Sequence, residues 1–230
     1  MYQNEFVIQE RVKSFIYLVY GWMALALSAT AAVAYYVSTR PAIYQYIFSS
    51  SWSLIGLFVA QIALVMILSF FLMRMSYATA IALFMLYAAS LGLTLSTIFM
   101  VYKIGSIYTT FGVTAGTFGV MCLYGYFTKT DLTGLSNILT MAVFGLILGM
   151  VINMFLQNAM MDYIISAIGV ILFTVLTAVD TQKIKKLGEQ LLGDEETSSK
   201  VAVLGALTLY LDFINLFLFL LNFLGEKRDR

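Results

Sequence analysis

Long apolar runs alternate with short polar breaks along the whole chain, and this pattern predicts an all-α, polytopic integral membrane protein. A helix needs about 20 apolar residues to cross a bilayer. Seven stretches reach this length, so we expect seven transmembrane helices in a single membrane domain over residues 1–230. The expected spans are 15–37, 53–73, 77–101, 105–127, 135–157, 163–181 and 202–224.

The connections between these spans are mostly very short, so consecutive helices should be antiparallel neighbours in one bundle. Two connections are longer, at 38–52 and 182–201. The second mixes lysines with acidic residues, and we interpret it as a solvated loop that could begin with a helical extension of the sixth span. Glycines four residues apart, Gly112 with Gly116 and Gly145 with Gly149, predict close helix packing.

Composition narrows the range of functions. The chain is 61% hydrophobic and 11% charged, and its net charge of +1 gives no electrostatic basis for binding nucleic acid. It contains no histidine and a single cysteine, Cys122 in an apolar run, which excludes an internal disulfide and a thiol metal cluster. Because histidine is absent, any pH sensing must use carboxylates. We also expect no cofactor and no enzymatic activity.

The basic residues favour a cytoplasmic N-terminus, because cytoplasmic loops of membrane proteins are enriched in lysine and arginine. With seven crossings, the side that carries the N-terminus holds Arg11, Lys13, Arg74, Lys129, Lys183, Lys185, Lys186 and Lys200, and the other side holds Arg40, Lys103, Lys227, Arg228 and Arg230. The basic tail conflicts mildly with this orientation, so a last segment that does not fully cross stays open.

Two aspartates interrupt the apolar pattern: Asp180 ends the run 164–179, and Asp212 lies inside the run 201–224. A carboxylate near a bilayer centre costs roughly 2.5 to 3.5 kcal/mol or more, so such residues usually face the bundle interior and mark an ion path, a proton site or a switch. Structural pairing with a basic residue or with backbone donors is the alternative.

If Asp180 and Asp212 lie within hydrogen-bond distance, both cannot readily be ionised at once, and one should hold a proton. The pair would then act as a pH-dependent clasp between the sixth and seventh helices. Arg74, on the same predicted side as Asp180, is a possible cationic partner, although it could equally extend toward the membrane surface. Oxygen ligands suit Ca²⁺, but two carboxylates fall short of a dedicated cage, so binding should be weak and transient.

Polar residues follow helical faces near these aspartates. In the last span Thr208, Asp212, Asn215 and Asn222 share one face, which suggests that this helix turns a polar stripe inward. Thr177 in the sixth span and Asn153 in the fifth belong to similar faces. We expect Thr208, Asn215, Asn222, Thr177 and Asn153 to line a polar interior or pore; ordinary interhelical hydrogen bonding is the alternative for each.

Three stretches resemble the transmembrane Bax inhibitor motif family, in its bacterial branch. The first runs from Ser106 to Leu132 and ends in LYGYFTKTDL, the second is LTAVDTQKIKKL at 176–187, and the third is ALTLYLDFINLF at 206–217. The resemblance implies six helices around a central seventh, a bacterial inner membrane location and a pH-sensitive Ca²⁺ leak. It also implies that Asp180 and Asp212 form the pH sensor and that Arg74 forms a latch.

The chain departs from that pattern at Val179, where relatives often have tyrosine, at Thr130, where they have arginine, and at Thr97, where many have proline. These changes bear on the local pore geometry and on the tuning of the sensor rather than on the fold.

Three other functions compete with a Ca²⁺ leak whose partners are lipid, protons and Ca²⁺. An intramembrane aspartyl protease also needs two aspartates, but Val179 and Leu211 stand where such enzymes have their motif residues. A non-transporting regulator of another membrane protein, such as an ATP-dependent protease, is allowed by the resemblance, with the segment 182–201 and the N-terminal segment as docking sites. A proton-coupled transporter ranks lower because no inverted repeat is visible.

Overall fold

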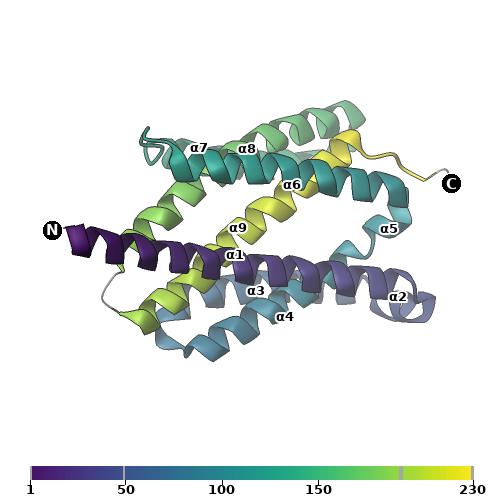
Figure 1. The fold of residues 1–230 in the computed structure, drawn as a ribbon. Helices are drawn as coiled ribbons and strands as arrows, with labels where there is room; N and C mark the ends of the chain where they lie inside the picture. The colour runs from purple at the N-terminus through teal and green to yellow at the C-terminus, as the bar shows by residue number, and fades with distance from the viewer. Residues whose placement is uncertain (1, 49, 192–193, 229–230) are drawn as a thin grey trace. The chain divides into compact units, whose positions relative to one another are not determined.

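The computed structural model describes residues 2–48, 50–191 and 194–228, so Arg230, counted above for orientation, lies outside the described residues. The described chain is helical almost throughout (Figure 1). The elements are α1 (Tyr2–Ser38), α2 (Pro41–Phe48), α3 (Ser51–Phe71), the 3-10 helix η1 (Leu72–Arg74), α4 (Tyr77–Leu95), α5 (Ile98–Val101), α6 (Ile104–Phe127), α7 (Leu135–Leu156), α8 (Ala159–Gln190) and α9 (Glu195–Leu224).

Among the described residues, seven helical segments are long and apolar enough to cross a membrane, which confirms the predicted number of spans. They cover Glu10–Ser38, Trp52–Arg74, Tyr77–Val101, Ile104–Phe127, Leu135–Leu156, Ala159–Gln190 and Glu195–Leu224. The boundaries differ from the prediction at polar ends, because a helix continues beyond its apolar part wherever side chains satisfy the terminal backbone groups.

The helical extension of the sixth span that was allowed for 182–201 is present, but the rest of this segment is not the expected solvated loop, because α9 begins early. α8 continues to Gln190, and α9 already begins at Glu195. The carboxylate of Asp194 caps α9 by accepting hydrogen bonds from the amides of Glu196 and Thr197, at 3.0 and 3.2 Å. Lys200 pairs with Glu196 one turn away at 2.7 Å. Charged residues at helical spacing therefore support helix here, although the segment is polar.

The expected connection 38–52 also contains a helix, α2, whose first residue is Pro41. Proline suits this position because its fixed backbone angle matches the helix and the missing amide would have no partner there.

The end of α7 also differs from the prediction. This helix stops where Gln157 adopts a left-handed conformation with φ of 49°. Gln157 therefore lies outside the helix that was expected to include it.

The chain divides into two compact units, formed by residues 1–101 with 187–210 and by residues 102–186 with 211–230. In the first unit, α4 packs against both α1 and α3. Tyr210 of α9 is fully buried in this unit, where its hydroxyl lies 2.7 Å from the hydroxyl of Thr30. Its ring meets those of Phe84 and Tyr87 edge-on, so a buried aromatic cluster with a satisfied polar group forms the core.

The second unit contains α6 to α8 up to Lys186 and the C-terminal half of α9. Phe213 of α9 lies between Phe111 and Phe118 of α6, with ring centroids 5.4 and 5.3 Å away. Phe219 of α9 stacks on Phe173 of α8 at 5.7 Å. These contacts fix the C-terminal half of α9 against two neighbours in this unit.

The buried fraction of the apolar window differs strongly among the spans. In α9, 72% of the apolar window is buried, in α8 61%, and in α7 only 6%. α9 also contributes to the cores of both units. This ranking agrees with the expectation that the last helix is an inner one, and it leaves most of the α7 window exposed.

Close helix contact occurs at glycines other than those that the sequence suggested. A Cβ atom added to Gly112, Gly116 or Gly145 would meet nothing within 4 Å in the described structure, and one on Gly149 would make an ordinary contact of 3.7 Å with Ile165. A Cβ on Gly125 of α6, in contrast, would overlap the carbonyl group of Ala178 on α8. Spacing alone could not distinguish these glycines, because it does not show which face meets a neighbour.

We expect Gly125→Ala to lower the free energy of unfolding of the purified protein by about 1–3 kcal/mol, because α6 and α8 must separate to admit the methyl group. Gly112→Ala, in the same helix, should leave stability unchanged or raise it, since alanine favours helix. Thermal unfolding in detergent compares the two. Equal losses of stability in both variants would contradict the assignment of the close contact to Gly125.

Candidate functional site

α8 and α9 run antiparallel in the second unit, and their contacts bring the two predicted sensor residues together. Asn222 contacts Ser166, Phe219 contacts Phe173, and closer to the other end of the pair Asp212 interacts with Asp180. A Cβ added to Gly169 would collide with the ring of Phe219 at 2.5 Å. A small residue at this position on α8 therefore lets the two helices approach.

Both aspartates are buried, with 9% of Asp180 and 5% of Asp212 exposed. Their carboxyl groups are close enough to repel each other when both are charged and to form a hydrogen bond when one holds a proton. The Oδ2 atom of Asp212 is buried without a hydrogen-bond partner among the described residues. A buried carboxylate oxygen is costly to leave unpaired, so a proton or a cation would stabilise this arrangement.

Lys183 supplies the positive charge that lies directly on the pair. Its Nζ atom donates to Oδ1 of Asp180 at 2.7 Å, from one turn further along α8. The same ammonium also acts electrostatically on Asp212. In the second unit the cationic partner of Asp180 is therefore on its own helix.

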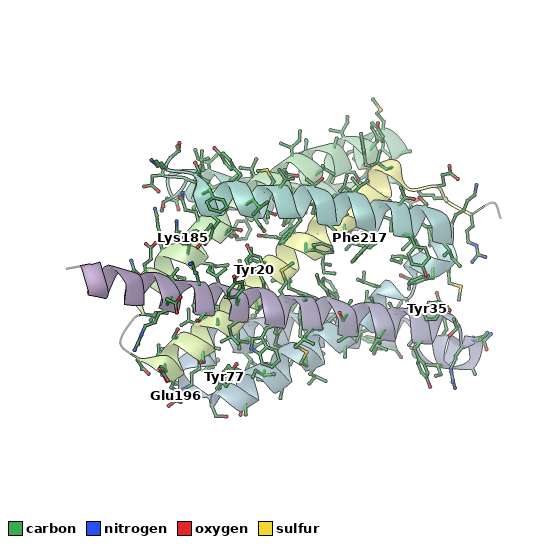
Figure 2. All side chains as sticks on the ribbon, viewed as in Figure 1. Tyr20, Tyr35, Tyr77, Lys185, Glu196 and Phe217 are labelled. Carbon is green, nitrogen blue, oxygen red and sulfur yellow. The ribbon has the colours of Figure 1, made fainter. Side chains whose placement is uncertain are left out.

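The next part of α8 is attached to the loop between α6 and α7. The side-chain amide of Gln182 donates to the carbonyl oxygen of Thr130 and accepts from the amide of Leu132, both at 2.8 Å. Lys185, labelled in Figure 2, is the next basic residue on α8 after Lys183. It donates to the carbonyl oxygen of Tyr126 at 3.0 Å, and its ammonium lies 4.8 Å from the ring centroid of that tyrosine. These bonds hold α8 in a fixed rotation just beyond Asp180.

Lys186 completes this attachment by pairing with Asp131 at 2.7 Å. Hydrogen bonds from Lys186 and Thr133 hold the pKa of Asp131 below its ordinary value.

A second aspartate outside the spans behaves in the same way. The pKa of Asp194 at the start of α9 is lowered by hydrogen bonds from Thr197. Both residues thus stay ionised near neutral pH, and whatever stability they add is lost only as acid protonates them.

The predicted polar stripes are satisfied largely within their own helices. Thr177, Thr208 and Asn215 each donate to the carbonyl oxygen four residues earlier, at 2.7, 3.1 and 2.8 Å. The side-chain oxygen of Asn153 accepts from the amide of Asn158 at 3.1 Å, where α7 ends. A role of these residues in a pore stays a prediction.

Asn222 differs because its partners lie on other elements. Its amide donates to Asp162 at 3.0 Å and to Ser166 at 2.7 Å, both on α8, and its oxygen accepts from the hydroxyl of Tyr102 at 3.2 Å. Burial, and then the nearby charge of Asp162, raise the pKa of Tyr102. This cluster lies about 27 Å along α8 from Asp180, at the other end of the helix.

Arg74, the predicted latch, ends η1 in the first unit. Its side chain is exposed, and the guanidinium carbon lies 5.9 Å from the ring centroid of Phe71. Because the aspartates belong to the second unit, the latch stays a prediction.

Sequence reasoning did not single out Lys183, Gln182 or Asp162. Lys183 could have been found from its position three residues after Asp180, which places the two side chains on one face. Gln182 and Asp162 carry no comparable signal, since their partners are distant in the sequence. Within residues 2–48, 50–191 and 194–228, no group of three or more histidine, cysteine or acidic side chains could hold a metal ion.

We expect Gln182→Met to loosen the loop between α6 and α7, because the variant removes the bond to Thr130 and leaves the buried amide of Leu132 unpaired. An unpaired buried group costs about 1–3 kcal/mol. Hydrogen exchange of residues 128–134 should become faster, whereas Lys186→Gln, which removes an exposed ion pair, should change it little. Unaltered protection of Leu132 in Gln182→Met would contradict this assignment.

Comparison with known proteins adds independent support for the resemblance. Residues 12–229 match the family model described as "Inhibitor of apoptosis-promoting Bax1". The chain is 47% identical over 229 residues to the inner membrane protein YbhL of Escherichia coli K12, covering 98% of both chains. It is 46% identical over 215 residues to an uncharacterised protein of Borreliella burgdorferi, covering 94% of this chain and 93% of the relative.

An uncharacterised protein of Deinococcus radiodurans is 41% identical over 220 residues, covering 96% of this chain and 93% of the relative. These relatives are bacterial, and the name of the first agrees with the predicted location in a bacterial inner membrane. Seven apolar helices and a match over nearly the whole length lead to one assignment. The chain belongs to the Bax inhibitor-1 family of multi-pass membrane proteins.

Proposed function

We propose that this protein is a pH-sensitive Ca²⁺ leak channel in the bacterial inner membrane, controlled by the pair Asp180 and Asp212. The observation that supports this most strongly is the unpaired Oδ2 atom of Asp212, buried beside a second carboxyl group. A purely structural pair would be expected to have its oxygens satisfied by fixed donors.

The proposed gate follows from electrostatics. When the two carboxyl groups share one proton, a hydrogen bond holds α8 and α9 together at this point. When the proton leaves, two negative charges face each other in a medium of low dielectric constant, and the helices must separate or take up a cation. The leak should therefore increase as the pair loses its proton.

The proposed cargo follows from the chemistry of the ligands. Hard oxygen atoms bind Ca²⁺ and do not favour softer transition metals. Two carboxylates give too few ligands for tight storage, which suits an ion that passes and leaves. With the N-terminus in the cytoplasm, the seven crossings would put the Asp180 end of α8 at the cytoplasmic side and the Asn222 cluster at the opposite side.

The test is Ca²⁺ flux into dye-loaded liposomes that contain the purified protein, between pH 5 and pH 8. The wild type should show flux that rises with pH as the pair deprotonates. Asp180→Asn combined with Asp212→Asn should remove most of this pH dependence, because neutral amides neither repel nor titrate. Asp131→Asn, at an exposed ion pair outside the spans, is the matched control and should keep the wild-type profile.

Flux with the same pH profile in the double variant would refute the proposed gate. Absence of flux at every pH would instead favour the non-transporting regulator of another membrane protein, which would then be sought by co-purification.

A further inference from the structure

The ion pair between Lys183 and Asp180 sits at the border between the buried pair and the solvent. The two groups are 2.7 Å apart, and the side chain of Lys183 is 36% exposed whereas that of Asp180 is 12% exposed. The lysine stem is flexible and its head is strongly hydrated, so the ammonium can leave Asp180 for water without any change in helix packing. The ammonium of Lys183 is thus a cation that can dissociate from a carboxylate held in place by its helix.

The other long polar side chains that follow Asp180 on α8 have partners elsewhere. Gln182 bonds to the loop at Thr130 and Leu132, Lys185 to the carbonyl oxygen of Tyr126, and Lys186 to Asp131. Lys183 is therefore the member of this lysine cluster that acts on the aspartates. It acts on Asp212 through space as well as on Asp180 by direct contact.

We propose that Lys183 is a tethered competitor for the cation that binds Asp180 and Asp212, and that it favours divalent over monovalent ions. This inference rests on the proposed function, since it specifies which ions the aspartate pair admits. A cation that reaches Asp180 must displace the ammonium or share the carboxylate with it.

The selectivity follows from a comparison of charges. A monovalent ion offers Asp180 the same single charge as the ammonium, which is already present at an effective concentration on the order of millimolar or more because it is tethered. A divalent ion offers twice the charge and can use oxygens of both aspartates at once. The lysine thus excludes K⁺ more effectively than it excludes Ca²⁺.

Lys183→Gln removes the competing charge and keeps a side chain of similar length. We expect the half-saturating Ca²⁺ concentration to fall about tenfold, the effect of one charge at close range. K⁺, which should not protect the wild type, should begin to do so. Lys183→Arg retains the charge and should resemble the wild type, as should Lys185→Gln, whose lysine faces Tyr126 instead.

The readout is the shift in thermal unfolding temperature of the purified, full-length protein in detergent, at fixed pH and ionic strength. CaCl₂ or KCl is titrated against a salt of a large organic cation. Gel filtration and helical circular dichroism confirm that each variant is folded. This measurement does not depend on transport, so a variant that binds but does not leak is still informative.

Unchanged Ca²⁺ and K⁺ responses in Lys183→Gln would overturn the proposal, as would an equal change in Lys185→Gln or the absence of any Ca²⁺ effect on the wild type. Parallel flux measurements separate the two claims. Ca²⁺ binding that tightens in Lys183→Gln without flux in any variant supports the tethered competitor and refutes the channel. If Lys183→Gln shows a pH-gated flux with the same preference for Ca²⁺ as the wild type, the result supports the channel and refutes the tethered competitor.

Discussion

The electrostatic cost of two carboxyl groups inside an apolar helix pair is the constraint on which the second unit depends. Asp180 and Asp212 are nearly inaccessible to water, they interact with each other, and a single cation, Lys183, pairs with Asp180. In a medium of low dielectric constant this arrangement is stable only with a proton or a cation between the helices. In the proposed function, the packing of α8 on α9 is coupled to the occupancy of this site by a proton or a cation.

The surrounding contacts concentrate that coupling at one point. Beyond Asp180, α8 is attached through Gln182 and its lysines to the loop after α6, and at its other end it is joined to α9 through Asn222. Between these attachments the contact is made by aromatic rings, such as Phe173 on Phe219. Proton loss at the aspartates would thus stress a segment held at both ends.

The sequence predicted the class, the number of spans and the two buried acids, because each depends on composition and on apolar length. A carboxylate within a long apolar run stands out because its burial in a membrane costs free energy. Asp180 and Asp212 could therefore be found without any knowledge of contacts. The sequence did not predict that the charged residues before the last apolar run begin α9, since that depends on the cap at Asp194 and on the ion pair of Lys200 with Glu196.

Contacts between elements were the least predictable part. Gly125 meets Ala178, whereas the regularly spaced Gly112 meets nothing, because the orientation of each helix is set by the whole packing. Asn222 belongs to the predicted stripe, but its partners Asp162 and Tyr102 come from distant segments. The stripe residues Thr208 and Asn215 return their hydrogen bonds to their own helix, which periodicity alone could not reveal.

The central claim is that the two aspartates share one proton inside the folded protein. Infrared spectroscopy tests it most directly, because a protonated carboxyl group has a carbonyl band that a carboxylate lacks. In lipid at neutral pH, the wild type should show such a band, the band should fade as the pH rises, and it should be missing from the Asp180→Asn, Asp212→Asn double variant. A folded wild type without this band at any pH, or a band that survives in the double variant, would contradict the account.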